Sequence, residues 1–146
     1  MSKRMLSLFL TSIVALNGIA TAAAQWSLVP GTGEFGTVYY DAASRKAWTD
    51  GRVAMTVKTV KVPTAGCTLA DCAAEIVATN VFACAARAGN IVATRLADKN
   101  GKHLGGFEIG EEAPTPVDVS PGTVGGYLFD RACAREAMPM PQRKST

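Results

Sequence analysis

Four cysteines are the residues of this sequence whose chemistry is clearest. They are Cys67, Cys72, Cys84 and Cys133. An even number of cysteines in an exported chain indicates disulfide bonds, and four cysteines permit three pairings. Cys67 and Cys72 are close enough to form a small ring within one loop, and Cys84 would then join Cys133. The chain-entropy treatment gives about 4 kcal/mol for the longer loop and about 2 kcal/mol for the ring.

Zinc binding is the alternative use of these cysteines. The Cys67/Cys72 spacing is wider than that of a typical zinc knuckle, and His103 is the only histidine in the chain. We therefore predict no metal site.

Catalytic motifs are also absent from the sequence. It contains no G-x-S-x-G nucleophile elbow, no H-E-x-x-H helix and no phosphate-binding loop. His103 follows a predicted hairpin turn, where a solvated polar residue is expected. Glu111-Glu112 stand in a proline-containing connection, where two carboxylates are usually a solvated charge pair. We predict no catalytic residue and no cofactor, and we expect that the protein is not an enzyme.

Loop residues are the remaining candidates for function. Lys99 and Lys102 flank Asn100-Gly101 at a predicted hairpin tip, which gives a weak basic patch suited to an acidic partner. A loop closed by Cys67 and Cys72 would lose little entropy on binding. We predict Lys99, Asn100 and Lys102 as the partner-binding residues.

The first 24 residues have the pattern of a signal peptide. Lys3 and Arg4 form a basic start, an apolar run extends over 6–20, and Ala22 and Ala24 provide the small residues that precede cleavage before Gln25. The run is shorter than the roughly 20 residues that span a bilayer. No cysteine lies near the cleavage site, so no lipid anchor is expected. We predict an exported protein, periplasmic or secreted to the cell surface.

The remaining chain has the size and charge of one nearly neutral domain. Removal of the leader leaves about 122 of the 146 residues, and the loss of Lys3 and Arg4 lowers the formal charge from +3 to +1. This charge argues against nucleic-acid binding. No second apolar stretch approaches transmembrane length.

The elements that carry these residues are mostly predicted strands. Short strands are expected over 25–29 and 37–40, whereas 41–48 is ambiguous between a helical turn and an edge strand. After the Asp50-Gly51 turn, a long strand begins with Val53, Met55 and Val57 on one face. The later apolar residues, Val60 and Val62, have the opposite phase, which predicts a bulge near Lys58-Thr59 or a strong twist there.

Two further hairpins are expected in the second half. A strand over 76–86 holds Cys84, Gly89-Asn90 turns the chain, and Asn100-Gly101 forms a type I′ turn between strands over 91–96 and 103–109. The segment 111–119 is expected to be an extended connection.

A C-terminal helix is expected over about 121–134, with Ser120 as its N-cap and Pro121 as its first residue. Val124, Leu128 and Ala132 share one face of this helix, and Gly125-Gly126 weaken it. The sequence thus predicts an α+β domain over 25–137. It is a small antiparallel sheet of five to six strands, with one disulfide-tethered helix packed on it. A basic disordered tail is expected over 138–146.

Several segments, in order, resemble the surface-adhesin protein E family of Gram-negative bacteria. The segments are Trp26; Val38-Tyr39-Tyr40-Asp41, Ser44 and Asp50-Gly51; Val53-Ala54-Met55-Thr56-Val57-Lys58; Phe82-Ala83-Cys84-Ala85-Ala86-Arg87; Gly101; and Val119-Ser120-Pro121-Gly122-Thr123 with Cys133. The resemblance covers almost all of the mature chain.

This resemblance implies a C-terminal helix tied to the sheet by a Cys84–Cys133 disulfide, which selects Cys67–Cys72 as the other pair. It also implies adhesion to host matrix and serum proteins such as laminin and vitronectin, and possible homodimerisation. The chain departs from the family in three features: it lacks a lipobox cysteine, it has the extra Cys67/Cys72 loop, and Pro116-Val117-Asp118 stands where the family often has tryptophan.

The function expected from these observations is an exported, non-enzymatic binding module. Two alternatives stay open. One is a periplasmic structural protein of the cell envelope without a host ligand. The other is a small-molecule carrier with a pocket between helix and sheet.

Overall fold

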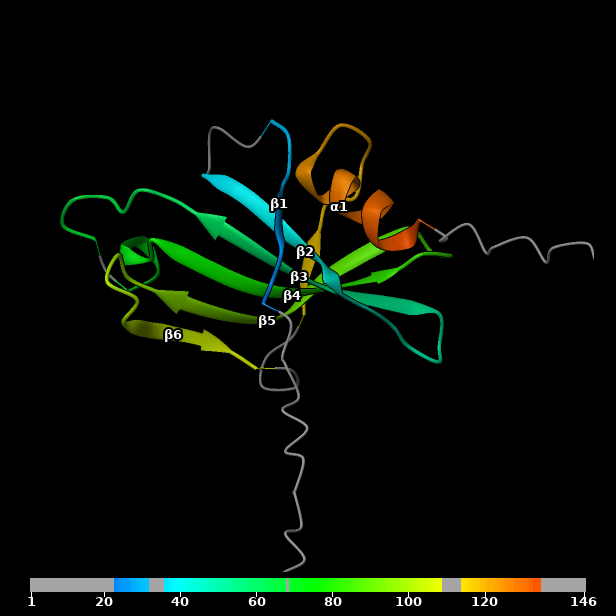
Figure 1. Ribbon diagram of the computed structural model, residues 1–146, viewed down its shortest axis with the longest axis horizontal. Helices are drawn as coiled ribbons and strands as arrows, with labels where there is room; N and C mark the ends of the chain where they lie inside the picture. The colour runs from blue at the N-terminus through cyan, green and yellow to red at the C-terminus, as the bar shows by residue number, and fades with distance from the viewer. Residues whose placement is uncertain (1–22, 32–35, 68, 109–113, 135–146) are drawn as a thin grey trace, which may run out of the picture.

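A computed structural model describes residues 23–31, 36–67, 69–108 and 114–134. The elements, in chain order, are β1 (Trp26–Leu28), β2 (Thr37–Ala47), β3 (Arg52–Val60), the 3₁₀ turn η1 (Leu69–Cys72), β4 (Glu75–Ala83), β5 (Ala88–Ala97), β6 (His103–Phe107), β7 (Thr115–Val117) and α1 (Val124–Cys133) (Figure 1). The predicted leader, Glu111-Glu112 and the basic tail fall almost entirely outside the described residues.

The strands form one antiparallel sheet. Its order is β1-β2-β3-β4-β5-β6, and β7 pairs with β5 on the side where β6 also pairs. Within the described residues this gives seven strands and one α-helix, which confirms the predicted fold class. The segment expected as an extended connection contains β7, a short edge strand of three residues.

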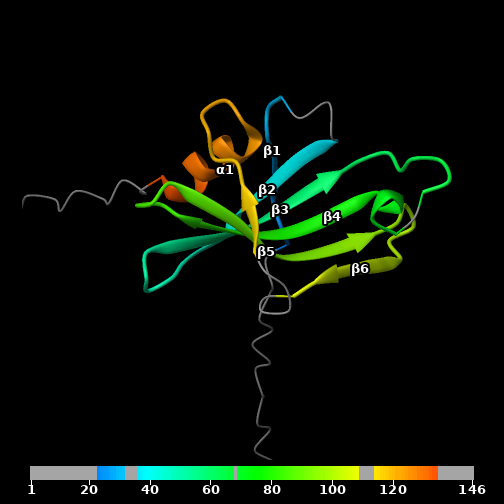
Figure 2. The ribbon, with the colours of Figure 1, turned by 180° about the vertical axis from the view of Figure 1, so that it is seen from behind.

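The hydrophobic core lies between one face of the sheet and α1, and the two opposite views show the helix on one side of the sheet (Figures 1 and 2). Alternate residues of β2 and β3 point to this face, because side chains alternate along a strand. Phe82, Met55 and Ala132 are almost completely buried there. The core residues are Val29, Val38, Tyr40, Val53, Met55, Val57, Phe82, Leu128, Phe129 and Ala132.

The helix begins three residues later than the sequence predicts. Its N-cap is Thr123, whose Oγ1 accepts a hydrogen bond from the Gly126 N–H at 2.9 Å. Ser120 instead uses its carbonyl oxygen to accept bonds from the N–H and the hydroxyl of Thr123. The Ser120 N-cap prediction was wrong because residues 121–122 form a turn before the helix starts.

The two helix glycines allow α1 to pack closely on the preceding segment. A Cβ on Gly125 would lie 2.1 Å from the Asp118 carbonyl oxygen, and one on Gly126 would lie 2.1 Å from that of Ser120. Real Cβ atoms do not approach oxygen so closely. Gly125 and Gly126 lower helix propensity, but the tertiary contact requires them.

The turn between β4 and β5 lies earlier than the sequence predicts. Strand β4 ends at Ala83, the turn covers 84–87, and Ala83 pairs with Ala88. Gly89-Asn90 therefore lie inside β5 and do not form the turn. A Cβ on Gly89 would meet the Phe82 ring at 2.8 Å, so this glycine is required by core packing.

Of the two alternatives predicted near Lys58-Thr59, a bulge or a strong twist, the bulge is wrong, because β3 pairs regularly with β4 from end to end. The register between β2 and β3 shifts elsewhere, between Asp41 and Lys46 of β2. The Asp41 carboxylate accepts the Ala43 N–H at 3.0 Å. The ambiguous segment 41–48 is thus mostly a bulged continuation of β2.

The Asn100-Gly101 hairpin is present, but its turn is not type I′. Only Gly101 has a positive φ (81°), whereas a type I′ turn needs two such residues. The Gly101 N–H donates to the Asp98 carbonyl oxygen at 3.0 Å. The Asp98 carboxylate accepts the N–H groups of Asn100 and Lys102. This carboxylate selects the turn that forms.

Candidate functional site

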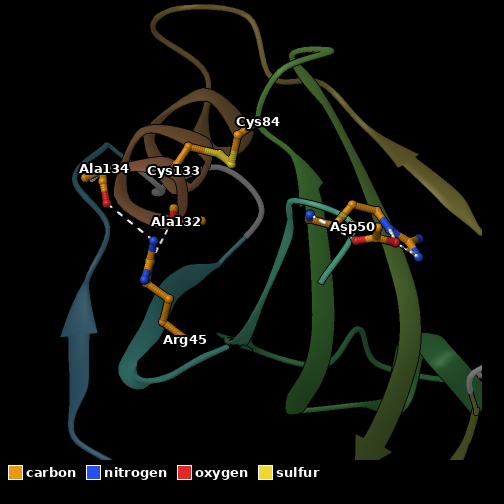
Figure 3. The surroundings of a disulfide bond; sticks show 7 residues. Arg45, Asp50, Cys84, Ala132, Cys133 and Ala134 are labelled. Carbon is orange, nitrogen blue, oxygen red and sulfur yellow. Dashed lines mark hydrogen bonds and ion pairs between the residues drawn. A yellow bond between two sulfur atoms is a disulfide. The ribbon is translucent and has the colours of Figure 1, made fainter. Parts of the chain in front are cut away.

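Both predicted disulfides are present. Cys67 pairs with Cys72 across five positions, and Cys84 pairs with Cys133 across 49 positions. The second bond joins the end of α1 to the turn after β4 (Figure 3). The two bonds lie at opposite ends of the sheet, because Cys67 and Cys72 lie in the connection before β4 and Cys84 lies in the turn after it.

The Cys67–Cys72 loop and the β5–β6 hairpin tip border the same shallow depression. Its volume is about 410 Å³, and it is lined by Val62, Pro63, Cys67, Cys72, Asp98, Lys99 and Asn100. We call these seven residues the loop-end surface. The structure thus brings together the two loops that were separate candidates in the sequence.

Backbone hydrogen bonds hold these loops on the sheet. The Ala74 N–H donates to the Ala97 carbonyl oxygen at 2.9 Å, and the Lys61 N–H donates to the Ala74 carbonyl oxygen at 3.0 Å. The disulfide closes the loop between these anchors. Val62, at 91 % exposure, projects an apolar side chain into solvent beside them. An exposed apolar side chain on a braced loop is suited to contact a partner.

The charge at the loop end is balanced. Lys99 and Lys102 are exposed, as predicted, but Lys102 does not line the depression. Asp98 lies in the depression with Lys99, and Asp71 is next to Cys72 in the loop. The pair of lysines therefore gives no strongly basic patch at this end.

His103 is exposed at the start of β6, as expected of a solvated residue. It borders a separate open depression of about 590 Å³ with Arg95 and Glu108 among its other lining residues. Within the described residues, no group of three or more His, Cys, Asp or Glu side chains could hold a metal ion. None of the described helices is long and apolar enough to cross a membrane.

Arg45, which the sequence analysis did not identify, lies at the other end of the sheet. The Arg45 Nε donates to the Ala132 carbonyl oxygen at 2.7 Å, and its Nη2 lies 3.4 Å from the Ala134 carbonyl oxygen (Figure 3). These contacts satisfy the end of α1, where carbonyl groups lack helical partners. No sequence spacing relates Arg45 to Ala132, because the contact depends on how the helix packs.

Arg52 belongs to the same end of the sheet. Its Nε and Nη2 bind the Asp50 carboxylate at 2.8 and 2.7 Å, and its guanidinium lies 4.6 Å from the Trp48 ring centre. The hydrogen bonds from Arg52 lower the pKa of Asp50, and the bond from Asp50 raises the pKa of Arg52. Both side chains are about half exposed, so this ion pair contributes little to stability.

The interface between α1 and the sheet is filled by side chains. Phe82 and Phe129 meet edge to face, with ring centres 6.0 Å apart, and Tyr40 and Tyr127 do the same at 6.2 Å. The rings fill this part of the interface, and an open depression of about 490 Å³ beside it is lined by residues of both α1 and the sheet, among them Phe129, Cys133 and Val53.

Comparison with known proteins gives no relative for this chain: no family model, no curated protein and no solved structure matches it. The resemblance to the surface-adhesin protein E family stays a prediction from the quoted motifs.

Proposed function

We propose that this protein is an exported, non-enzymatic binding module and that its protein partner docks on the loop-end surface. The observation that carries the proposal is the convergence of the Cys67–Cys72 loop and the Lys99-Asn100 turn around one depression. Two loops distant in sequence form one surface there.

Rigidity supports binding at this end. The Cys67–Cys72 bond and the Asp98-centred turn hold both loops before a partner arrives. Binding to pre-ordered loops loses less conformational entropy than binding to flexible ones. The exposed Val62 adds an apolar contact, and Lys99 and Asn100 add polar ones. This mixture of one apolar residue with a polar rim is typical of a small protein-binding surface.

Laminin and vitronectin are the first partners to test, because the resemblance to surface-adhesin protein E implies them. The purified mature protein would be measured on each immobilised partner at low and at physiological salt. We expect binding that falls by roughly tenfold or more in a Val62→Asp/Lys99→Ala variant, because a buried unpaired charge and a lost contact each oppose docking. Lys46→Ala, which removes an exposed lysine from β2, is the matched control and should bind as the wild type does.

Protease treatment of intact cells tests the location that adhesion requires. A surface protein is cleaved in intact cells, whereas a periplasmic protein is cleaved only after the outer membrane is opened. Retention in the periplasm together with no binding to either partner would contradict adhesion and favour the structural alternative.

A further inference from the structure

The two disulfide bonds differ in how the rest of the protein holds their sulfur atoms. Cys84 and Cys133 both pack against the hydrophobic core, and Cys133 follows the fully buried Ala132. Among the described residues, neither Cys67 nor Cys72 belongs to this core. Packing would therefore keep the thiols of Cys84 and Cys133 together after reduction, whereas Cys67 and Cys72 lack this support.

The loop closed by the Cys67–Cys72 bond is anchored to the sheet at its two ends. The Lys61 N–H donates to the Ala74 carbonyl oxygen at 3.0 Å, and Ala73 is fully buried. Between these anchors, residues 64–66 are exposed, and η1 is a single 3₁₀ turn of four residues, which is not stable by itself. The disulfide therefore supplies the constraint that keeps the loop closed between its anchors.

The Cys67–Cys72 bond is also open to attack by a thiol, because both cysteines line the loop-end surface. Cys84 and Cys133 line an open depression as well, so access alone does not distinguish the two bonds. The difference lies in how readily each bond forms again. Thiols that packing holds together have a high effective concentration, whereas thiols on a released loop do not. An exposed disulfide with little native support is the more easily reduced one.

We propose that the Cys67–Cys72 bond is a redox switch for the loop-end surface. Reduction turns the segment 62–72 into an open loop and removes the surface, and reoxidation restores it. This regulation rests on the function proposed above, since it controls binding at the same surface. The sheet stays folded, because the anchors at Lys61 and Ala73 do not depend on the bond and the Cys84–Cys133 bond keeps α1 in place.

The chemical step is a thiol–disulfide exchange with a dithiol reductant. A thiolate of the reductant attacks the sulfur of Cys67 or Cys72, forms a mixed disulfide and displaces the other cysteine as a thiolate. The second thiol of the reductant then attacks the mixed disulfide and releases the first cysteine. The reductant leaves as a disulfide, its two thiol protons pass to the cysteines, and two electrons are transferred.

Graded ratios of reduced to oxidised dithiothreitol test the order in which the two bonds open. At each ratio, the free thiols of the purified mature protein are alkylated and located by peptide mass spectrometry. We expect a range of ratios in which Cys67 and Cys72 are alkylated and Cys84 and Cys133 are not, with the circular dichroism of the oxidised sheet retained. Alkylation of Cys84 and Cys133 at the same or at a less reducing ratio would overturn the proposal.

Elastase cleavage after Ala65 reports the state of the loop without any partner, since this protease cuts after small residues. The selectively reduced protein should be cleaved there roughly tenfold faster or more, because a released loop enters the protease more readily. Ala85 and Ala86 are exposed in the β4–β5 turn, and cleavage there is the internal control that should not change. Equal cleavage after Ala65 in the oxidised and reduced proteins would contradict the switch.

Binding to laminin and vitronectin is then measured with oxidised, selectively reduced and reoxidised protein. We expect affinity to fall by roughly tenfold or more on reduction and to recover on reoxidation, because the ordered surface is lost and regained. Cys67→Ser/Cys72→Ser should bind as weakly as the reduced wild type at every ratio. Unchanged binding after selective reduction would overturn the switch. Absence of binding by the oxidised protein would instead contradict the proposed function, and the elastase result would then decide whether the bond controls the loop.

Discussion

Gly125 illustrates how a single residue can have opposite effects on a helix and on its packing. Replacing glycine by alanine inside a helix favours the helix by about 1 kcal/mol. At Gly125 the added Cβ would lie 2.1 Å from the Asp118 carbonyl oxygen and 2.6 Å from a Val117 methyl carbon. A backbone oxygen cannot move aside without shifting the whole segment, so the clash outweighs the gain in propensity.

We therefore predict that Gly125→Ala destabilises the fold by about 1–3 kcal/mol, measured as the free energy of unfolding in urea. Asp130→Ala, at an exposed position of the same helix, is the control and should change stability by no more than about 0.5 kcal/mol. Equal or greater stability of Gly125→Ala would show that α1 does not pack so closely on the segment before it.

Asp118 gives a prediction about pH. The Ser120 hydroxyl and the Ser120 N–H lower the pKa of the Asp118 carboxyl. A lowered pKa in the folded state means that the ionised carboxylate stabilises the fold above about pH 4, and that this contribution is lost as the pH falls through the folded pKa. Asp118→Asn should therefore show a smaller loss of stability than the wild type between about pH 5 and pH 2.

Chemical unfolding at several pH values measures this difference. The pKa of Asp50 is also lowered, so the Asp118→Asn variant should still lose some stability as the pH falls. Superimposable pH profiles of wild type and Asp118→Asn would contradict the role of the Ser120 bonds.

At the scale of elements, α1 depends on its attachment to the sheet. The helix has only ten residues and two internal glycines, so it is too short and too weak to be stable alone. Burial of Leu128, Phe129 and Ala132, the Cys84–Cys133 bond and the Arg45 contacts hold it on the sheet. The Cys67–Cys72 bond constrains only one loop.

The two disulfides should therefore differ in their effect on stability. Cys84→Ser/Cys133→Ser should lower the free energy of unfolding by about 4 kcal/mol, and Cys67→Ser/Cys72→Ser by about 2 kcal/mol, since the loop that each closes differs in length. Urea denaturation of each double variant, with the other disulfide intact, measures both effects. A larger loss from the Cys67/Cys72 pair would mean that the loop end, not the helix, limits stability.

At the scale of the whole molecule, the two disulfides brace opposite ends of the domain. The loop end carries the surface proposed for a protein partner, whereas the opposite end holds the helix against the sheet.

The proposed adhesion requires export, and the position of the first strand decides which residues the mature protein must keep. Strand β1 begins at Trp26, so cleavage before Gln25 leaves the described sheet intact. We predict that the protein expressed with its leader in a Gram-negative host is recovered from the periplasm with Gln25 as its first residue. Intact mass spectrometry checks this, with an Ala22→Arg/Ala24→Arg variant as the uncleaved control. A mature protein that still carries its leader would contradict the signal-peptide prediction.

The sequence by itself determined the class of the fold. Alternating apolar residues such as Val53, Met55 and Val57 predicted strands, and Val124, Leu128 and Ala132 predicted the buried face of the helix. These signals are local and periodic, so they can be recognised without knowing which elements pack together. The short spacing of Cys67 and Cys72 indicated one disulfide for the same reason, whereas the Cys84–Cys133 pairing came from the family resemblance.

Only the tertiary structure decided the positions where local preference and packing compete. From the sequence, Gly89 indicates a turn and Gly125 weakens a helix. In the structure each position requires glycine, because another atom lies where a Cβ would be. The bulge falls in β2 and not in β3 because Asp41 bonds its own neighbouring backbone. Arg45 meets α1 across 87 positions, so no sequence pattern marks it. The loop-end surface forms in this way, because its two loops, distant in sequence, become neighbours only when the strands of the sheet have paired.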